Sequence, residues 1–241
     1  MRIKYIYHSG FFIEMKECNI VIDYYKGNIP EFDKEKKLYV LSSHGHRDHF
    51  NKEVFSIFEE CKNVTYILSD DIEKDVVKLY IEKNKINMDD KKIIYVSPNE
   101  GYKIDDIEIE TLKSTDQGVG FIIKVDEKNI YHSGDLHWWT WHGYETEEEY
   151  KHMTENFKRE IDIIKGRYFD IVMSVLDPRQ ERYDWGLEYL LDKIKTKCVI
   201  PMHLWGKYDY VNKFVEGHRE KLKGIEVVNP IDICDTWFEW R

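Results

Sequence analysis

The fold prediction rests on residues 38–49, Leu38-Tyr-Val-Leu-Ser-Ser-His44-Gly-His46-Arg-Asp48-His49. The first half of this stretch is a short apolar run rich in strand-forming residues, which predicts a buried β-strand. The second half places three of the chain's ten histidines and one aspartate within six residues. Imidazole and carboxylate groups are ligands of divalent first-row metals, and a loop at the end of a strand can hold them on a rigid frame. We therefore expect a metal site on this loop rather than a solvated polar turn.

Five segments, in chain order, resemble landmarks of the metallo-β-lactamase superfamily. They are Tyr7–Glu14, similar to the first hairpin of its lactonase-like and phosphodiesterase-like branch; Asn19–Asp23, a strand that ends in Asp; the His-x-His-x-Asp-His motif at 44–49; Ile130–Asp135, a strand that ends in Gly-Asp; and Val199–His203, a strand that carries a last histidine. The resemblance implies an α+β fold, an αββα sandwich of two mixed β-sheets flanked by helices.

The patterns of apolar residues fit this fold class, because strands and helices alternate along the chain. Helices are expected near residues 52–60, 70–83, 150–165, 186–196 and 208–222. Strands are expected as three short runs within 2–24, and at 38–43, 64–68, 92–96, 106–112, 119–125, 129–133, 170–176, 198–202 and 236–240. No Pro-, Gly- or Ser-rich linker interrupts the sequence, so residues 1–241 are expected to form a single domain.

The resemblance also implies a ligand set for one or two metal ions. His44 and His46 would bind a first metal, Asp48, His49 and His203 a second, and Asp135 would bridge the two. The expected metal is zinc or manganese, with iron as a further candidate.

One ligand of the family pattern is missing. The family supplies a third histidine about twenty residues before the bridging aspartate, and the corresponding segment 112–121 contains none. Ser114 falls at the ligand position and Asp116 lies two residues on. Asp116 replaces the imidazole, or water fills the place, or the first metal position is weak. An oxygen ligand would shift the preference from zinc towards manganese.

Several other residues are candidates for a substrate pocket. His8 follows a strand near the expected metal site, with a substrate or a structural role. Trp138, Trp139 and Trp141 follow Asp135 directly; they form a pocket wall or pack in the core under a helix. Arg179 could hold an anionic group of a substrate, or pair with a surface carboxylate.

Composition limits the partners and the compartment. With 36 basic and 46 acidic residues the formal charge is −10, which counts against binding of nucleic acids. The four cysteines are scattered and are expected to be structural. The sequence shows no signal peptide and no apolar run of membrane-spanning length, so a cytoplasmic protein with a small-molecule substrate is expected. The sequence does not indicate an oligomeric state.

The resemblance implies a metal-dependent hydrolase that uses metal-bound hydroxide to cleave a small ester, lactone or phosphodiester, with Asp48 as the catalytic carboxylate that accepts the proton of the water. Two alternatives remain open at this point. One is an iron-dependent oxidoreductase on the same fold, and the other is a metal-binding protein without catalytic activity.

Overall fold

The computed structural model describes residues 1–240, and these divide into two compact units. The first unit contains residues 1–97 together with the segment from residue 233 onward, and the second contains residues 98–232. Each unit is built on one seven-stranded sheet. The prediction that residues 1–241 form a single domain stays a prediction.

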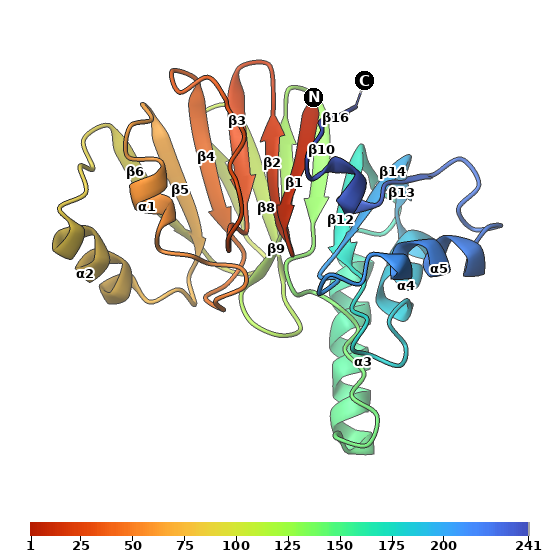
Figure 1. Cartoon of the computed structure of the whole chain (residues 1–241). Helices are drawn as coiled ribbons and strands as arrows, with labels where there is room; N and C mark the ends of the chain where they lie inside the picture. The colour runs from red at the N-terminus through yellow and green to blue at the C-terminus, as the bar shows by residue number, and fades with distance from the viewer. Residues whose placement is uncertain (241) are drawn as a thin grey trace. The chain divides into compact units, whose positions relative to one another are not determined.

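The sheet of the first unit has the order β16-β1-β2-β3-β4-β5-β6 (Figure 1). The first three strands and β16 are joined by antiparallel pairs, whereas β3 to β6 are parallel, so the sheet is mixed. Its strands are β1 (Arg2–Tyr7), β2 (Gly10–Glu14), β3 (Cys18–Ile22), β4 (Lys37–Ser42), β5 (Val64–Ser69), β6 (Lys91–Val96) and β16 (Phe238–Glu239).

One face of this sheet is covered by α1 (Val54–Ile57) and α2 (Lys74–Asn84). Phe55 of α1 packs on Tyr66 of β5 with ring centres 4.4 Å apart, and Val77 of α2 belongs to the same apolar cluster. Strand residues that alternate with this cluster, such as Ile20 and Ile67, are buried as well. Apolar side chains on both faces are typical of a sheet that is covered on both sides.

The sheet of the second unit has the order β15-β14-β12-β10-β9-β8-β7. Pairs from β7 to β10 are antiparallel and pairs from β10 to β15 are parallel. Its strands are β7 (Gly101–Ile104), β8 (Ile107–Lys113), β9 (Val119–Val125), β10 (Lys128–His132), β12 (Ile171–Val175), β14 (Cys198–Met202) and β15 (Glu226–Val227). The short strands β11 (Tyr168–Phe169) and β13 (Lys195–Thr196) form a separate pair, and η1 (Pro230–Ile233) is a 3₁₀ turn.

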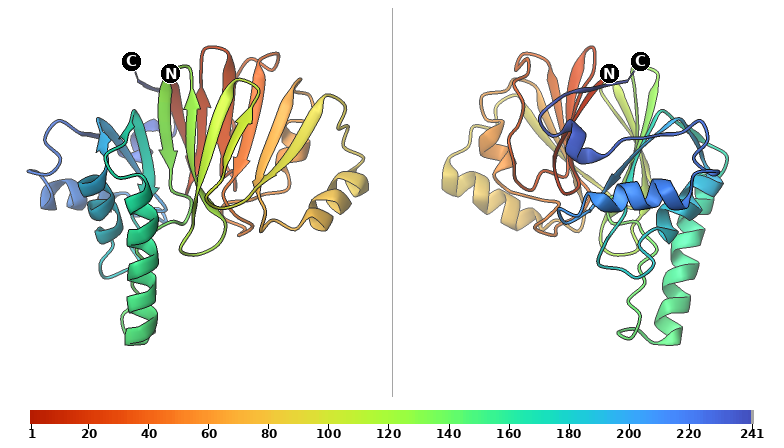
Figure 2. Two further views of the ribbon diagram at one scale, coloured as in Figure 1. Left: turned by 180° about the vertical axis from the view of Figure 1, so that it is seen from behind. Right: turned by 45° about the vertical axis from the view of Figure 1, so that its right-hand side comes forward.

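Three helices gather against the second sheet, α3 (Glu147–Ile163), α4 (Trp185–Lys193) and α5 (Asp209–Gly217) (Figure 2). Their apolar residues, among them Phe157, Leu190 and Phe214, share one core cluster with Tyr131 of the sheet. The start of α3 is fixed by a capping box between Thr146 and Glu149, which satisfies backbone N–H groups that a helix end leaves open. No helix within residues 1–240 is both long and apolar enough to span a bilayer.

Strand direction decides where the polar loops lie. In the first sheet β1, β3, β4 and β5 are parallel to one another, because β2 is antiparallel to both β1 and β3. In the second sheet β8, β10, β12 and β14 are parallel for the same reason. Carboxyl ends of parallel strands meet at one edge, where open sheets with parallel strands hold their ligands.

The predicted elements are largely confirmed, with differences at their ends. The strand prediction 198–202 coincides with β14, whereas the helices predicted at 52–60 and 208–222 are shorter, α1 and α5. Strand β7 was not predicted. Three of the four cysteines, Cys18, Cys61 and Cys198, are buried, and none of the four forms a disulfide within residues 1–240.

Candidate metal centre

Polar residues from four loops meet at the carboxyl edge of the first sheet. His8 follows β1, Asp23 follows β3, residues 43–49 follow β4 and Asp71 follows β5. His8, Asp48 and His49 each bring one possible ligand atom within 4.8 Å of the others. Both His8 and His49 are buried, so their imidazoles are held in place by the surrounding chain.

Asp23 holds the loop 43–49 in place through contacts with Ser43 and His49. Its carboxylate accepts the backbone N–H of Ser43 at 2.7 Å and the Ser43 hydroxyl at 2.7 Å, and it lies 2.7 Å from Nδ1 of His49. Because Nδ1 faces Asp23, Nε2 lies on the other side of the ring. A carboxylate behind the second nitrogen is what metal-ligating histidines usually have.

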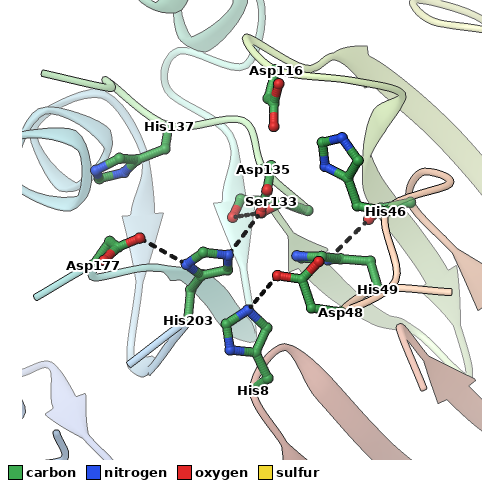
Figure 3. A network of polar contacts seen from close by, with 12 residues as sticks. His8, His46, Asp48, His49, Asp116, Ser133, Asp135, His137, Asp177 and His203 are labelled. Atoms are coloured by element: carbon green, nitrogen blue, oxygen red, sulfur yellow. Dashed lines mark hydrogen bonds and ion pairs between the residues drawn. The ribbon is translucent and has the colours of Figure 1, made fainter. Parts of the chain in front are cut away.

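His8 and Asp48 form a pair, with 3.3 Å between Nε2 of His8 and the nearer carboxylate oxygen (Figure 3). Burial acts to raise the pKa of Asp48. The hydrogen bond from His8 and the charges of His49 and His8 outweigh burial and hold this pKa well below its ordinary range. Asp48 is therefore ionised at neutral pH, as a metal ligand must be.

His44 and His46 lie together at the same edge, with Nε2 of His44 3.1 Å from Nδ1 of His46. Nδ1 of His44 lies 3.0 Å from the Ser43 hydroxyl. Between the two histidines, the N–H of Gly45 donates to Asp71 at 2.8 Å, which fixes the backbone of the loop. The motif thus brings four histidine and aspartate side chains to one edge of the first sheet.

The second unit places its predicted ligands at the carboxyl edge of its own sheet. Asp135 follows β10, His203 follows β14, and Asp116 lies on the loop after β8. One carboxylate oxygen of Asp116 lies within 4.8 Å of one of Asp135, and Figure 3 shows the Asp116 side chain directed towards Asp135. Thr115 joins the two loops, because its hydroxyl donates to the carbonyl oxygen of His137 at 2.6 Å.

His203 lies between two carboxylates (Figure 3). Its Nδ1 is 3.0 Å from Oδ2 of Asp177, and its Nε2 is 3.6 Å from Oδ1 of Asp135. Asp177 is fully buried and also accepts hydrogen bonds from Arg179. Burial acts to raise the pKa of Asp177, but the hydrogen bonds from His203 and Arg179 outweigh it and hold this pKa well below its ordinary range.

Left-handed backbone conformations mark several of these positions. The φ angles are +60° at His8, +47° at Asp23 and +65° at His203. A non-glycine residue rarely adopts such angles, and where it does the strain of about 1–3 kcal/mol is typical of functional sites.

The three tryptophans after Asp135 have different surroundings. Trp138 packs with Phe157 and Trp185, and its Nε1 donates to Thr154 of α3 at 2.9 Å, so its contacts favour the core-packing alternative. Trp139 and Trp141 stack nearly parallel, with 6.0 Å between ring centres and 4° between planes.

Trp139 also meets the ring of His203 edge to face at 5.7 Å. A pocket role for Trp139 and Trp141 stays a prediction.

His137, on the same loop, is a buried neutral residue. Burial lowers the pKa of His137 to about 4, although the charge of Asp177 acts in the opposite direction. Its Nε2 lies 3.1 Å from Oε1 of Gln180, and its ring lies against Gly186. A methyl group at Gly186 would come within 2.4 Å of Nδ1, so a glycine is required there.

Two residues of this arrangement were not predicted as site residues, Asp23 and Asp177. Each faces Nδ1 of a histidine that lies 26 residues away in the sequence. The signal for both was an aspartate just after a buried strand. For Arg179, the alternative of a carboxylate partner holds, but that partner is the buried Asp177 and not a surface group.

Comparisons with known proteins identify the family of the chain. A family model described as "Beta-lactamase superfamily domain" matches residues 2–148. The "UPF0173 metal-dependent hydrolase NEQ378" of Nanoarchaeum equitans (strain Kin4-M) is 30% identical over 216 residues, which cover 84% of this chain and 83% of that protein. The "Probable L-ascorbate-6-phosphate lactonase UlaG" of Salmonella heidelberg (strain SL476) is 24% identical over 196 residues, and the match spans 70% of this chain but only 50% of the lactonase.

Among solved structures, that of Igni18, described as a novel metallo hydrolase from the hyperthermophilic archaeon Ignicoccus hospitalis KIN4/I, covers 100% of this chain and 99% of its own, with a TM-score of 0.60 and 19% identity. This likeness confirms the predicted α+β fold with two mixed β-sheets and helices. The family model, which matches more than half of the sequence, shows that the chain belongs to the metallo-β-lactamase superfamily.

Proposed function

We propose that the chain is a metal-dependent hydrolase whose metal ligands follow the family pattern. The observation that carries the proposal is a repeated one: a carboxylate faces Nδ1 of a histidine in each unit, Asp23 behind His49 and Asp177 behind His203. Such pairs fix the tautomer and raise the basicity of a metal-ligating imidazole. A family relative named as a metal-dependent hydrolase supports the proposed hydrolase activity.

The donor set fits a divalent first-row metal. Buried imidazoles and carboxylates stand at the carboxyl edge of each sheet, and nitrogen and oxygen donors of this kind suit zinc, manganese and iron. Following the family pattern, His44, His46 and Asp116 would hold one ion, Asp48, His49 and His203 a second, and Asp135 would bridge.

A bound metal of this kind supplies acidity to a coordinated water and polarises the bond to be cleaved. Residues of the chain would transfer the proton, orient a ligand and bind the substrate. Asp48, held ionised by His8, accepts the proton of the attacking water. Asp177 keeps the ring of His203 in one orientation and one tautomer. Trp139 and Trp141 give an apolar wall beside His203 that holds the body of a substrate and limits the access of bulk water.

The proposed substrate is a small ester, lactone or phosphodiester. The lactonase named among the relatives supports the lactone, although that protein is about twice as long as the matched region. The proposed partners are therefore small molecules, in a cytoplasmic setting.

The test is hydrolysis by the chelator-treated protein reloaded with zinc, manganese or, without oxygen, iron(II). The substrates are a p-nitrophenyl ester, a γ-lactone followed with a pH indicator, and bis(p-nitrophenyl) phosphate. We expect turnover of at least one substrate in a loaded form. Asp48→Asn and His203→Ala should each lower it about 1,000-fold or more, and His152→Ala, an exposed histidine on α3, should leave it unchanged.

Equal turnover before and after removal of the metal would contradict the proposal. Oxygen consumption by the iron form without any hydrolysis would replace it by the oxidoreductase alternative. Metal binding without any reaction would leave a metal-binding protein as the function.

A further inference from the structure

A cation in contact with two aromatic rings lies near His203 in the second unit. The guanidinium carbon of Arg179 is 4.4 Å from the ring centre of Trp205 and 5.5 Å from that of Trp141. The ring of Trp205 also meets His203 edge to face at 5.6 Å. The two tryptophans are 43% and 38% exposed, so a ligand in solution can reach the indole rings.

The guanidinium uses one edge and leaves another open. Nε donates to Oδ1 and Oδ2 of Asp177 at 3.0 and 2.9 Å, and Nη2 donates to Oδ2 at 2.5 Å. Among residues 1–240, Nη1 has no hydrogen-bonding partner. Five N–H groups are available on a guanidinium, and the outer pair on Nη1 and Nη2 forms a fork that matches the two oxygens of a carboxylate or a phosphate.

The surroundings favour a ligand site over a purely structural ion pair. An ion pair between Arg179 and Asp177 requires no indole rings against the guanidinium. Trp205 reaches its position with a φ of +51°, a strained conformation that is typical of ligand clamps. The chain as a whole carries a formal charge of −10 and repels anions at long range, so an anionic ligand needs a local cation of this kind.

We propose that Arg179, Trp141 and Trp205 form an anion subsite beside the metal centre. The subsite binds a carboxylate or phosphate group attached to a flat or apolar body, with the charged group on the outer edge of Arg179 and the body against the indoles. The inference rests on the proposed function in naming the substrate of that centre as anionic, but binding at the subsite does not require hydrolysis.

The experiment measures binding to the chelator-treated protein, because a bound metal would itself attract anions. The indole N–H signals of Trp141 and Trp205 are followed by NMR and assigned with Trp141→Phe and Trp205→Phe. The probes are benzoate, inorganic phosphate and benzyl alcohol, the last as the neutral counterpart of benzoate. Arg179→Gln is compared with Arg182→Gln, a control three residues further along the chain whose side chain lies over Trp185.

We expect benzoate or phosphate to shift both signals to saturation, and benzyl alcohol to shift them far less. Whichever of the two anions binds more tightly identifies the preferred acidic group. Arg179→Gln should weaken binding about 10- to 100-fold, as expected for a charge-assisted hydrogen bond, and Arg182→Gln should bind as the wild type does. If Arg179→Gln does not fold, Arg179→Lys, which keeps a charge beside Asp177, should still weaken binding because an ammonium lacks the fork.

Unchanged affinity in the Arg179 variant that folds, or equal shifts with benzoate and benzyl alcohol, would overturn the inference. A protein that binds benzoate through Arg179 but hydrolyses none of the test substrates would refute the proposed function alone. Conversely, hydrolysis without this binding would refute the anion subsite alone.

Discussion

Replacing Asp177 by Asn should weaken metal binding more than it weakens the fold. The variant keeps the shape of the side chain but removes the charge that Nδ1 of His203 faces at 3.0 Å. Loss of such a carboxylate behind a ligating histidine typically costs 10- to 100-fold in metal affinity, or about 1.4–2.8 kcal/mol. Arg179, the other partner of Asp177, is 41% exposed, so water can solvate its freed edge and limit the loss of stability.

Asp170 offers a matched control at the opposite end of the same strand, β12. It is buried like Asp177, accepts the N–H of Asn129 at 2.9 Å and lies 3.5 Å from Nζ of Lys128. Asp170→Asn should therefore lower the thermal midpoint without changing metal affinity.

The assay is competition for zinc and for manganese against a chromophoric chelator, with thermal midpoints recorded on the same samples. We expect Asp177→Asn to raise the dissociation constant by one to two orders of magnitude and Asp170→Asn to leave it within about twofold. If Asp177→Asn binds metal as tightly as the wild type, or if both variants lose affinity equally, the orienting role of Asp177 is refuted.

Three further predictions concern neighbouring positions. Asp116→Ala should raise the dissociation constant of the more weakly bound metal about tenfold and leave the tighter one unchanged, as measured by calorimetric titration; two unaffected ions would contradict it. Gly186→Ala should destabilise the fold by about 1–3 kcal/mol, because its methyl group would lie 2.4 Å from a buried imidazole. Gly217→Ala should not destabilise the fold, because its methyl group would have no neighbouring atom within 4 Å. Urea unfolding of the two variants compares their free energies of unfolding. Trp138→Ala should cost about 3 kcal/mol of stability with little effect on KM, whereas Trp141→Ala should raise KM several-fold at nearly unchanged stability; the reverse pattern would show that the pocket lies elsewhere.

The sequence predicted the fold well because its strongest patterns are local. The apolar run before His44 and the strand 198–202 are short, buried and bounded by polar residues, and both form parallel strands with a neighbour on each side. Helix ends were less predictable. The helix predicted at 208–222 ends at Gly217. The prediction was too long because the apolar pattern continues into a turn, in which Leu222 is buried without helical backbone.

The predicted ligands could be recognised in the sequence because they are polar groups on loops that follow strands, and in the structure they lie at the carboxyl edges of the sheets. The partners behind them were not predicted. Asp23 and Asp177 are recognisable as orienting groups only once parallel strands have brought residues 26 positions apart into contact. Trp138 and Trp141 show the same limit, because side chains three residues apart on one loop have different neighbours, the helical core for one and Arg179 for the other.

The central claim, a metal centre whose ligands follow the family pattern, is tested most directly by metal affinity in two single variants. His49→Ala and His203→Ala each remove one proposed ligand of the same ion. We predict that each variant, measured by competition against a chelator and by elemental analysis after gel filtration, loses at least about 100-fold in affinity for the same ion. Full retention of that ion by either variant would show that the replaced histidine is not a ligand and would contradict the account.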